Sequence, residues 1–152
     1  MTSIVNALYE VRFNPFKYGE YLASFYSILN ETEENLLLAP LVIPICSHPL
    51  FATKLAKANV RSSIWSIFQE RSQLYDLQER VDEFQILTEQ SLQYCIVNDW
   101  IFFEEDRLML HCKTVNDSKL SIQKSAYNLG RLFQGHTAVS YTHLRAHETA
   151  MY

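Results

Sequence analysis

The sequence predicts a mostly helical domain with one small β-hairpin before its last helix. Glycine occurs only three times in 152 residues, which disfavours a turn-rich β-sandwich and favours long helices with short connections. Apolar residues recur at steps of three and four along most of the chain, as on the buried face of a helix. The period changes to two only over residues 100–113, as in paired strands. This α+β order, helices and then a hairpin, is also compatible with a winged-helix arrangement.

The composition predicts one folded domain. Apolar residues make up 48% of the chain and charged residues 20%, which is typical of a globular protein with a sizeable core. No internal repeat, low-complexity tract or linker interrupts the pattern. We therefore expect residues 1–138 to form a single domain; the last fourteen residues are considered separately below.

The first helix is predicted to run from about residue 15 to 30. Asn14 can accept a hydrogen bond as N-cap, and Pro15 suits the first helical position. A buried stripe follows at steps of four, three and four: Tyr18, Leu22, Phe25 and Leu29.

Two proline-marked segments come next. Pro40 and Pro44 interrupt the apolar run 36–46, so we expect a buried, kinked segment made of two short helical pieces. Pro49 then marks the first turn of a short helix that ends near Ala58.

A long helix is predicted from an N-cap at Ser62 or Ser63 to about Glu83. Its apolar stripe consists of Ile64, Ile67, Leu74, Leu77, Val81 and Phe84. Thr88 is the expected N-cap of a further helix that ends near Asn98.

The hairpin is predicted from residues 100–104 and 107–113, which flank Glu105 and Asp106. The last helix is expected to begin near Asp117 or Ser118 and to end at Gly135. Its predicted buried positions are Ile122, Ala126, Leu129 and Phe133.

Charge disfavours nucleic acid as a partner. The net charge is −4 and Lys and Arg are scattered singly, whereas nucleic-acid binders carry a basic face. The helix that would lie in the groove of DNA, residues 88–99, contains no Lys or Arg, and the hairpin tip at residues 104–106 is acidic. A winged-helix-like DNA-binding regulator is therefore kept only as the alternative function.

No catalytic, cofactor-binding or metal-binding constellation is found, so we expect a protein that is not an enzyme. The chain has no GxGxxG, GxxxxGK[ST] or GxSxG motif. His48 is expected at a helix start and His111 on a strand. The cysteines, Cys46, Cys95 and Cys112, share no CxxC spacing, and we expect buried, reduced thiols.

The last residues do not fit the rest. VSYTHLRAHET, residues 139–149, spaces His143 and His147 as two ligands on one helix face, but Glu148 follows the second histidine and no third ligand is near. The stretch resembles one reading frame through the adapter used to prepare sequencing libraries. We therefore expect residues 139–152 to be a non-native tail and the natural sequence to be truncated near Ala138.

The sequence predicts neither a signal peptide nor a membrane span. The N-terminal residues lack a basic and then apolar pattern. The longest apolar run, residues 36–46, has eleven residues, against about 20 for a spanning helix. A cytoplasmic protein that acts through its surface is expected, with Trp65 and Trp100 as contact candidates and with Trp100 more typical of a core position.

Several stretches resemble one family, the middle component of bacterial three-component ABC systems. They are an Asn-Pro entry helix, a proline-interrupted apolar segment that ends at a histidine, a T-x-Q-S-L helix, and a late A-x-x-x-G-R-x-F block. The matching positions are Asn14, Pro15, Pro44, His48, Thr88, Gln90, Leu92, Ala126, Gly130, Arg131 and Phe133. The resemblance covers nearly all of residues 1–138, and family members continue beyond this block.

The resemblance implies an adaptor subunit encoded near an ABC-type ATPase and an effector or sensor, in a prokaryotic conflict system of antiphage type. Two residues of the last block carry physical expectations as well. Glycine inside a helix costs about 1 kcal/mol relative to alanine, so Gly130 is expected to permit close approach of another element. Arg131 can bind a carboxylate with two parallel hydrogen bonds.

Overall fold

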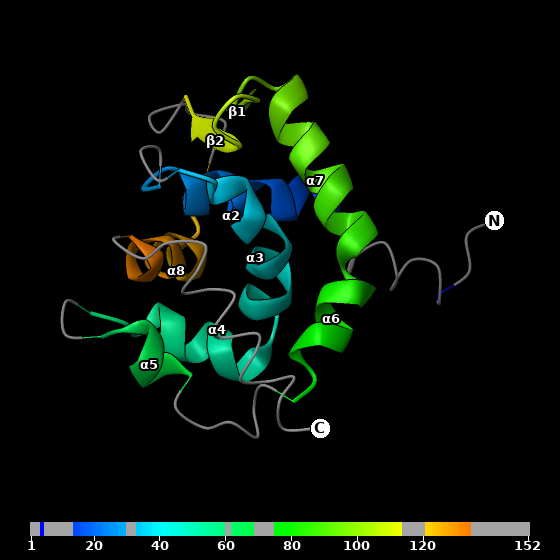
Figure 1. Ribbon diagram of the computed structural model, residues 1–152. Coiled ribbons are helices and arrows are strands. Elements are labelled where there is room, and N and C mark those ends of the chain that lie inside the picture. Colours follow the sequence, from blue (N-terminus) through cyan, green and yellow to red (C-terminus); the bar gives the residue numbers. More distant parts are fainter. Residues whose placement is uncertain are drawn as a thin grey trace.

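The computed structural model describes Ile4 and residues 14–29, 33–59, 62–68, 75–113 and 121–134, with the backbone alone at positions 64 and 65. Helices dominate, and one two-stranded hairpin precedes the last helix, which confirms the predicted fold class (Figure 1). The helices are α2 (Pro15–Tyr26), the 3-10 helix η1 (Asn35–Leu38), α3 (Ala39–Cys46), α4 (Pro49–Ala56), α5 (Ile64–Ile67), α6 (Leu77–Glu83), α7 (Gln85–Val97) and α8 (Lys124–Phe133). The strands are β1 (Ile101–Glu104) and β2 (Met109–Cys112).

Helix α2 is the centre of the arrangement. It packs against α7, α8 and α3 and also contacts β2, while α4 packs against α8 and α3. In Figure 1, α7 lies at one side of α2 and the orange α8 at the other. The four predicted buried positions, Tyr18, Leu22, Phe25 and Leu29, are all buried. The predicted end near residue 30 is wrong, because α2 ends at Tyr26 with Ser27 as C-cap and Leu29 lies beyond it.

The proline-marked segments also fold as predicted. The apolar run divides into η1 and α3, with Pro40 in the first turn of α3 and Pro44 inside it. Pro44 has no N–H to donate to the carbonyl four residues earlier. Helix α4 begins at Pro49 and ends at Ala56, close to the predicted Ala58.

The predicted long helix from Ser62 to Glu83 is wrong. Helix α5 ends at Ile67, Phe68 lies in a bend, and Tyr75 and Asp76 form a turn before α6. The start was correct: Ser63 Oγ accepts from Ser66 N at 3.2 Å and Ser66 Oγ accepts from Ser63 N at 2.8 Å, a reciprocal cap. The apolar spacing continued across the break because both pieces bury apolar residues, but against different neighbours. Phe68 packs on Phe51 with ring centroids 5.0 Å apart, whereas α6 packs on α3.

Two further helix starts differ from the prediction. Thr88 is not an N-cap but lies within α7, where its N–H donates to Phe84 O at 2.9 Å. Helix α7 ends at Val97 with Asn98 as C-cap, as expected. Helix α8 begins only at Lys124, so Ile122 precedes it and is 42% exposed rather than buried. The backbone N–H of Gln123 donates to Ser24 Oγ at 2.9 Å, which connects the chain to α2 just before α8 begins.

The hairpin is confirmed, with a longer turn than expected. Ile101 pairs with Cys112 and Glu104 with Met109, and residues 105–108 form the turn. The predicted alternation along β2 is partly wrong, because Met109 and Leu110 are both buried. Strand β2 contacts both α2 and η1, and Leu36 N of η1 donates to Leu108 O in the hairpin turn at 3.1 Å.

The core contains the tryptophan and the three cysteines that the sequence placed there. Trp100 is 4% exposed, and Cys46, Cys95 and Cys112 are buried free thiols, as predicted. Within the described ranges no single helix is long and apolar enough to cross a bilayer; η1 and α3 taken with α4 reach that length and composition, but the pair bends by 103°. The predictions for Gly135 and for residues 139–152 concern positions outside the described residues.

Candidate functional site

The Asn-Pro entry motif builds the start of α2. Asn14 Oδ1 accepts from Phe16 N at 2.9 Å, and Pro15 occupies the first helical position. This satisfies one of the free N–H groups of the first turn. The ring of Phe16 meets the edge of Tyr94 on α7 with centroids 4.9 Å apart. The motif therefore orients α2 against α7.

The middle motif forms the joint between α3 and α4. His48 is the N-cap of α4, and its Nδ1 accepts from Leu50 N at 3.2 Å. Burial, followed by the nearby charge of Arg80, lowers the pKa of His48, which keeps Nδ1 free to accept. Arg80 Nη2 donates to Pro44 O at 3.1 Å and to Ser47 Oγ at 2.8 Å. This guanidinium satisfies one carbonyl in the last turn of α3, where a positive charge is favourable.

The T-x-Q-S-L motif divides between the two faces of α7. Thr88 and Ser91 are buried, Leu92 is partly buried, and Gln90 is exposed. The hydroxyl oxygens of Thr88 and Ser91 have no hydrogen-bond partner in the described part of the chain. Gln90 belongs to the outward face.

The late motif packs α8 onto α2. A Cβ added to Gly130 would lie 2.5 Å from Phe25 O and 2.7 Å from Ile28 Cγ2, which confirms the predicted close approach. Ala126 is fully buried, and Phe133 meets the edge of Phe25 with ring centroids 6.2 Å apart. These positions leave no room for a larger residue at Gly130.

Arg131 contacts a backbone carbonyl. Its Nη2 donates to Asn59 O at 3.0 Å, and its buried Nε has no partner among the described residues. Among the described residues it donates to this carbonyl and not to a carboxylate; a carboxylate on a partner stays a prediction. The contact connects α8 to the segment after α4.

Asn35 is a central residue that the sequence analysis missed. Its Nδ2 donates to Leu29 O at 2.9 Å and to Leu110 O at 3.0 Å, and its Oδ1 accepts from Leu110 N. Tyr26 Oη donates to the carbonyl of Asn35 at 2.8 Å. One buried amide thus joins η1, the segment that follows α2 and strand β2. In the sequence, an asparagine beside an acidic stretch is typical of a turn. Only its burial in the structure shows that it joins three segments.

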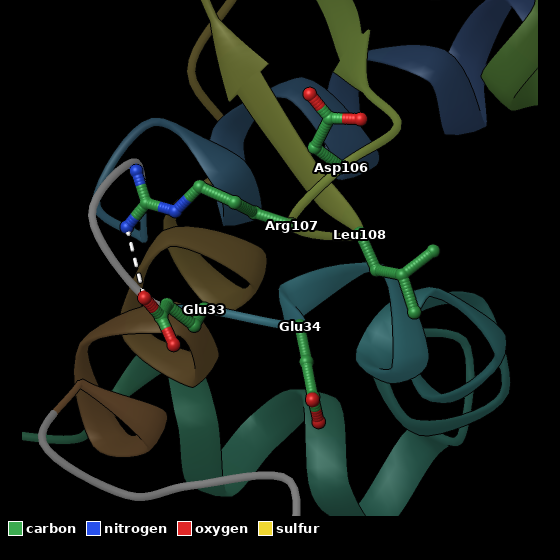
Figure 2. Close-up of a pocket in the computed structure, with 5 residues that line it drawn as sticks. All are labelled: Glu33, Glu34, Asp106, Arg107 and Leu108. Carbon is green, nitrogen blue, oxygen red and sulfur yellow. Dashed lines mark hydrogen bonds and ion pairs between the residues drawn. The ribbon is translucent and has the colours of Figure 1, made fainter.

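A hollow of about 180 Å³ lies between the hairpin turn and η1, lined by Glu33, Glu34, Asp106, Arg107 and Leu108. Figure 2 shows the guanidinium of Arg107 reaching toward Glu33, while the carboxylates of Glu34 and Asp106 point away in different directions. The Glu33–Arg107 pair spans 3.2 Å but both side chains are about half exposed or more, so it stabilises by about 1 kcal/mol at most.

This hollow does not have the geometry of a reaction or metal site. Its carboxylates do not converge, and its cation is already paired. Among the described residues, no group of three His, Cys, Asp or Glu is placed to hold a metal ion. The excess of negative charge also opposes binding of phosphate groups.

The outward side of α7 carries exposed apolar side chains. Ile86 and Val97 are 69% and 72% exposed and Ile96 is 42% exposed, on a helix whose opposite side is buried. The tryptophans do not supply such a feature: Trp100 is in the core, and the side chain of Trp65 is outside the description. This outward side is therefore the best candidate contact surface among the described residues.

The chain matches one protein-family model. Residues 2–146 match the family model described as ABC-three component (ABC-3C) system Middle Component 3. No curated protein and no solved structure gives a significant match. The matched range extends past Ala138 into the stretch that resembles an adapter, whose origin stays a prediction.

Proposed function

Because the chain belongs to the ABC-three component system Middle Component 3 family, we propose that it is a non-catalytic adaptor. In this role it links an ABC-type ATPase to an effector or sensor component through protein–protein contacts. The observation that carries the proposal is the family match itself, which covers nearly the whole chain. A middle component has the other components of the system as its partners.

The placement of the motif residues supports an adaptor. Asn14, His48 and Gly130 each fix how two helices meet, by capping a helix or by permitting close approach. The motif residues are spread over α2, α3, α4, α7 and α8 and do not converge on one reactive cluster. Residues that specify a rigid scaffold suit a protein whose surface does the work.

The biological setting is part of the proposal. The partners would be encoded beside this chain, in a prokaryotic conflict system directed against phage, and the complex would act in the cytoplasm. The acidic end of the hairpin, Glu104 at the end of β1 with Glu105 and Asp106 in the turn, favours protein partners over DNA, because phosphates would be repelled there.

Co-expression tests this role. The chain is produced with each of the two proteins encoded beside its gene, and complexes are measured by size-exclusion chromatography with light scattering. We expect a stable complex with at least one neighbour, and no ATP hydrolysis by the chain alone. Elution of the chain as a separate species in both mixtures would refute the adaptor role.

A further inference from the structure

The outward side of α7 has an unusual composition for a solvent-exposed helix. Ile86, Gln90, Gln93 and Val97 follow one another at steps of four, three and four, which places them on one face. All four are exposed, and the two aliphatic ends are about 70% exposed. The ends are eleven residues apart, or about 16 Å along a helix. We call these four residues, with Glu89 and Ile96 beside them, the α7 face.

The scaffold leaves this face uncovered. Helix α7 packs on α2 and α3 through its opposite side, and α6 and β1 contact it as well. Its buried residues, Leu87, Thr88, Ser91 and Cys95, all belong to that opposite side. In Figure 1 the green α7 lies at the margin of the described helices. Apolar side chains on both sides of one helix are expected when one side packs on the core and the other on a partner.

The elements that carry and adjoin the α7 face are acidic. From Asp76 to Asp99, which spans α6 and α7, the chain contains six Asp and Glu residues, all exposed, and only one Lys or Arg, Arg80, a net charge of −5, although the whole chain carries −4. The guanidinium of Arg80 is directed to Pro44 O and Ser47 Oγ. On the face itself Glu89 is the one charged residue.

We propose that the α7 face binds a basic surface of another component of the system, in which apolar side chains are surrounded by Lys and Arg. The inference rests on the proposed adaptor function and names the surface and the partner chemistry for it. Apolar anchors at Ile86 and Val97 supply contact area, and the acidic surroundings attract and orient a cationic partner. A symmetric dimer through this face would bring equivalent acidic surroundings together, so a second copy of the chain is disfavoured.

Opposite charges at one position give the sharpest test. Gln93→Lys and Gln93→Glu have similar size and helix propensity, so a steric effect would change binding equally in both. The full chain is titrated with whichever neighbouring gene product forms the complex, at two salt concentrations. We expect Gln93→Lys to weaken binding about threefold or more, and Gln93→Glu to leave it unchanged or tighter, with the difference shrinking at high salt.

The apolar anchors are tested with a matched control. The double substitution Ile86→Ser and Val97→Ser is expected to weaken binding about tenfold or more. Leu50→Ser on α4, at a residue that is 37% exposed, should leave binding unchanged. Far-UV circular dichroism verifies that each variant keeps its helical content.

The outcomes separate this inference from the proposed function. Equal binding by the wild type and all α7 variants would overturn the α7 face as the interface and leave the adaptor role intact. Dimerisation of the chain alone that the double substitution abolishes would assign the face to a second copy and also overturn the inference. Absence of any complex with the wild type would refute the adaptor role, and the inference with it.

Discussion

Replacement of Gly130 by alanine tests the packing of α8 on α2. The new Cβ would lie 2.5 Å from Phe25 O and 2.7 Å from Ile28 Cγ2. Ordinary contact distances are about 3.5 Å, so the two helices would have to separate locally by about 1 Å. The nearest atom belongs to the backbone of α2, which cannot rotate away as a side chain can.

Two effects of opposite sign decide the outcome. Alanine stabilises a helix by about 1 kcal/mol relative to glycine, whereas forcing extra volume into a packed core costs about 1–3 kcal/mol. With a backbone atom as the obstacle, we take the upper value and expect a net loss of about 2 kcal/mol in the free energy of unfolding. For a chain of this size that corresponds to a fall in Tm of about 4–8 °C.

Gly19→Ala is the matched control. Its Cβ would meet Tyr94 Cδ1 at 2.9 Å and Cys95 Sγ at 3.4 Å, and both belong to side chains that can shift. The packing cost and the gain in helix propensity should then nearly cancel, within about 1 kcal/mol. Thermal and urea unfolding followed by circular dichroism measures both variants. A Gly130→Ala protein as stable as the wild type would refute the close-packing argument.

Three further predictions concern the buried amide, the thiols and DNA. Asn35→Ala leaves Leu110 N and two carbonyls without their buried partner and should lower the free energy of unfolding in urea by about 3 kcal/mol or more. Asn98→Ala, at an exposed cap, should lower it by about 1 kcal/mol. Equal losses for the two variants would contradict this. Burial raises the pKa of Cys46 and of Cys95 to about 12, so both remain protonated when folded, while unfolded thiols ionise above about pH 8.5. The contribution of the buried thiols to the free energy of unfolding should therefore be fully present below that pH. It should fall toward pH 12 by about 1.4 kcal/mol per pH unit for each thiol. Identical urea midpoints at pH 8 and pH 10 would refute this prediction. Duplex DNA should not bind even at low salt, and salt-sensitive binding would support the winged-helix alternative instead.

Local signals in the sequence predicted the starts of α2, α4 and α5. Asn14, Pro49 and Ser63 act through hydrogen bonds or backbone angles within three residues, so their effect is readable from the chain alone. The hairpin was predictable because its period differs from that of the helices. Gly130 was predictable as a close approach because a glycine inside a helix needs a compensating contact.

Features that depend on distant neighbours were not predictable. The break between α5 and α6 is invisible in the apolar spacing, because Phe68 packs on Phe51 while α6 packs on α3. Asn35 gains its role from Leu110, 75 positions away. The α7 face was missed for a related reason: Ile86 and Val97 resemble core residues in the sequence, and only their exposure distinguishes them.

The most direct test of the account is the mass of the complex formed by all three components. The two neighbouring gene products are co-expressed with and without this chain, and the masses of the purified complexes are measured by native mass spectrometry. The adaptor account predicts one complex that contains all three proteins, and no association of the other two when this chain is omitted. A complex of the two neighbours that forms equally well without this chain would contradict it.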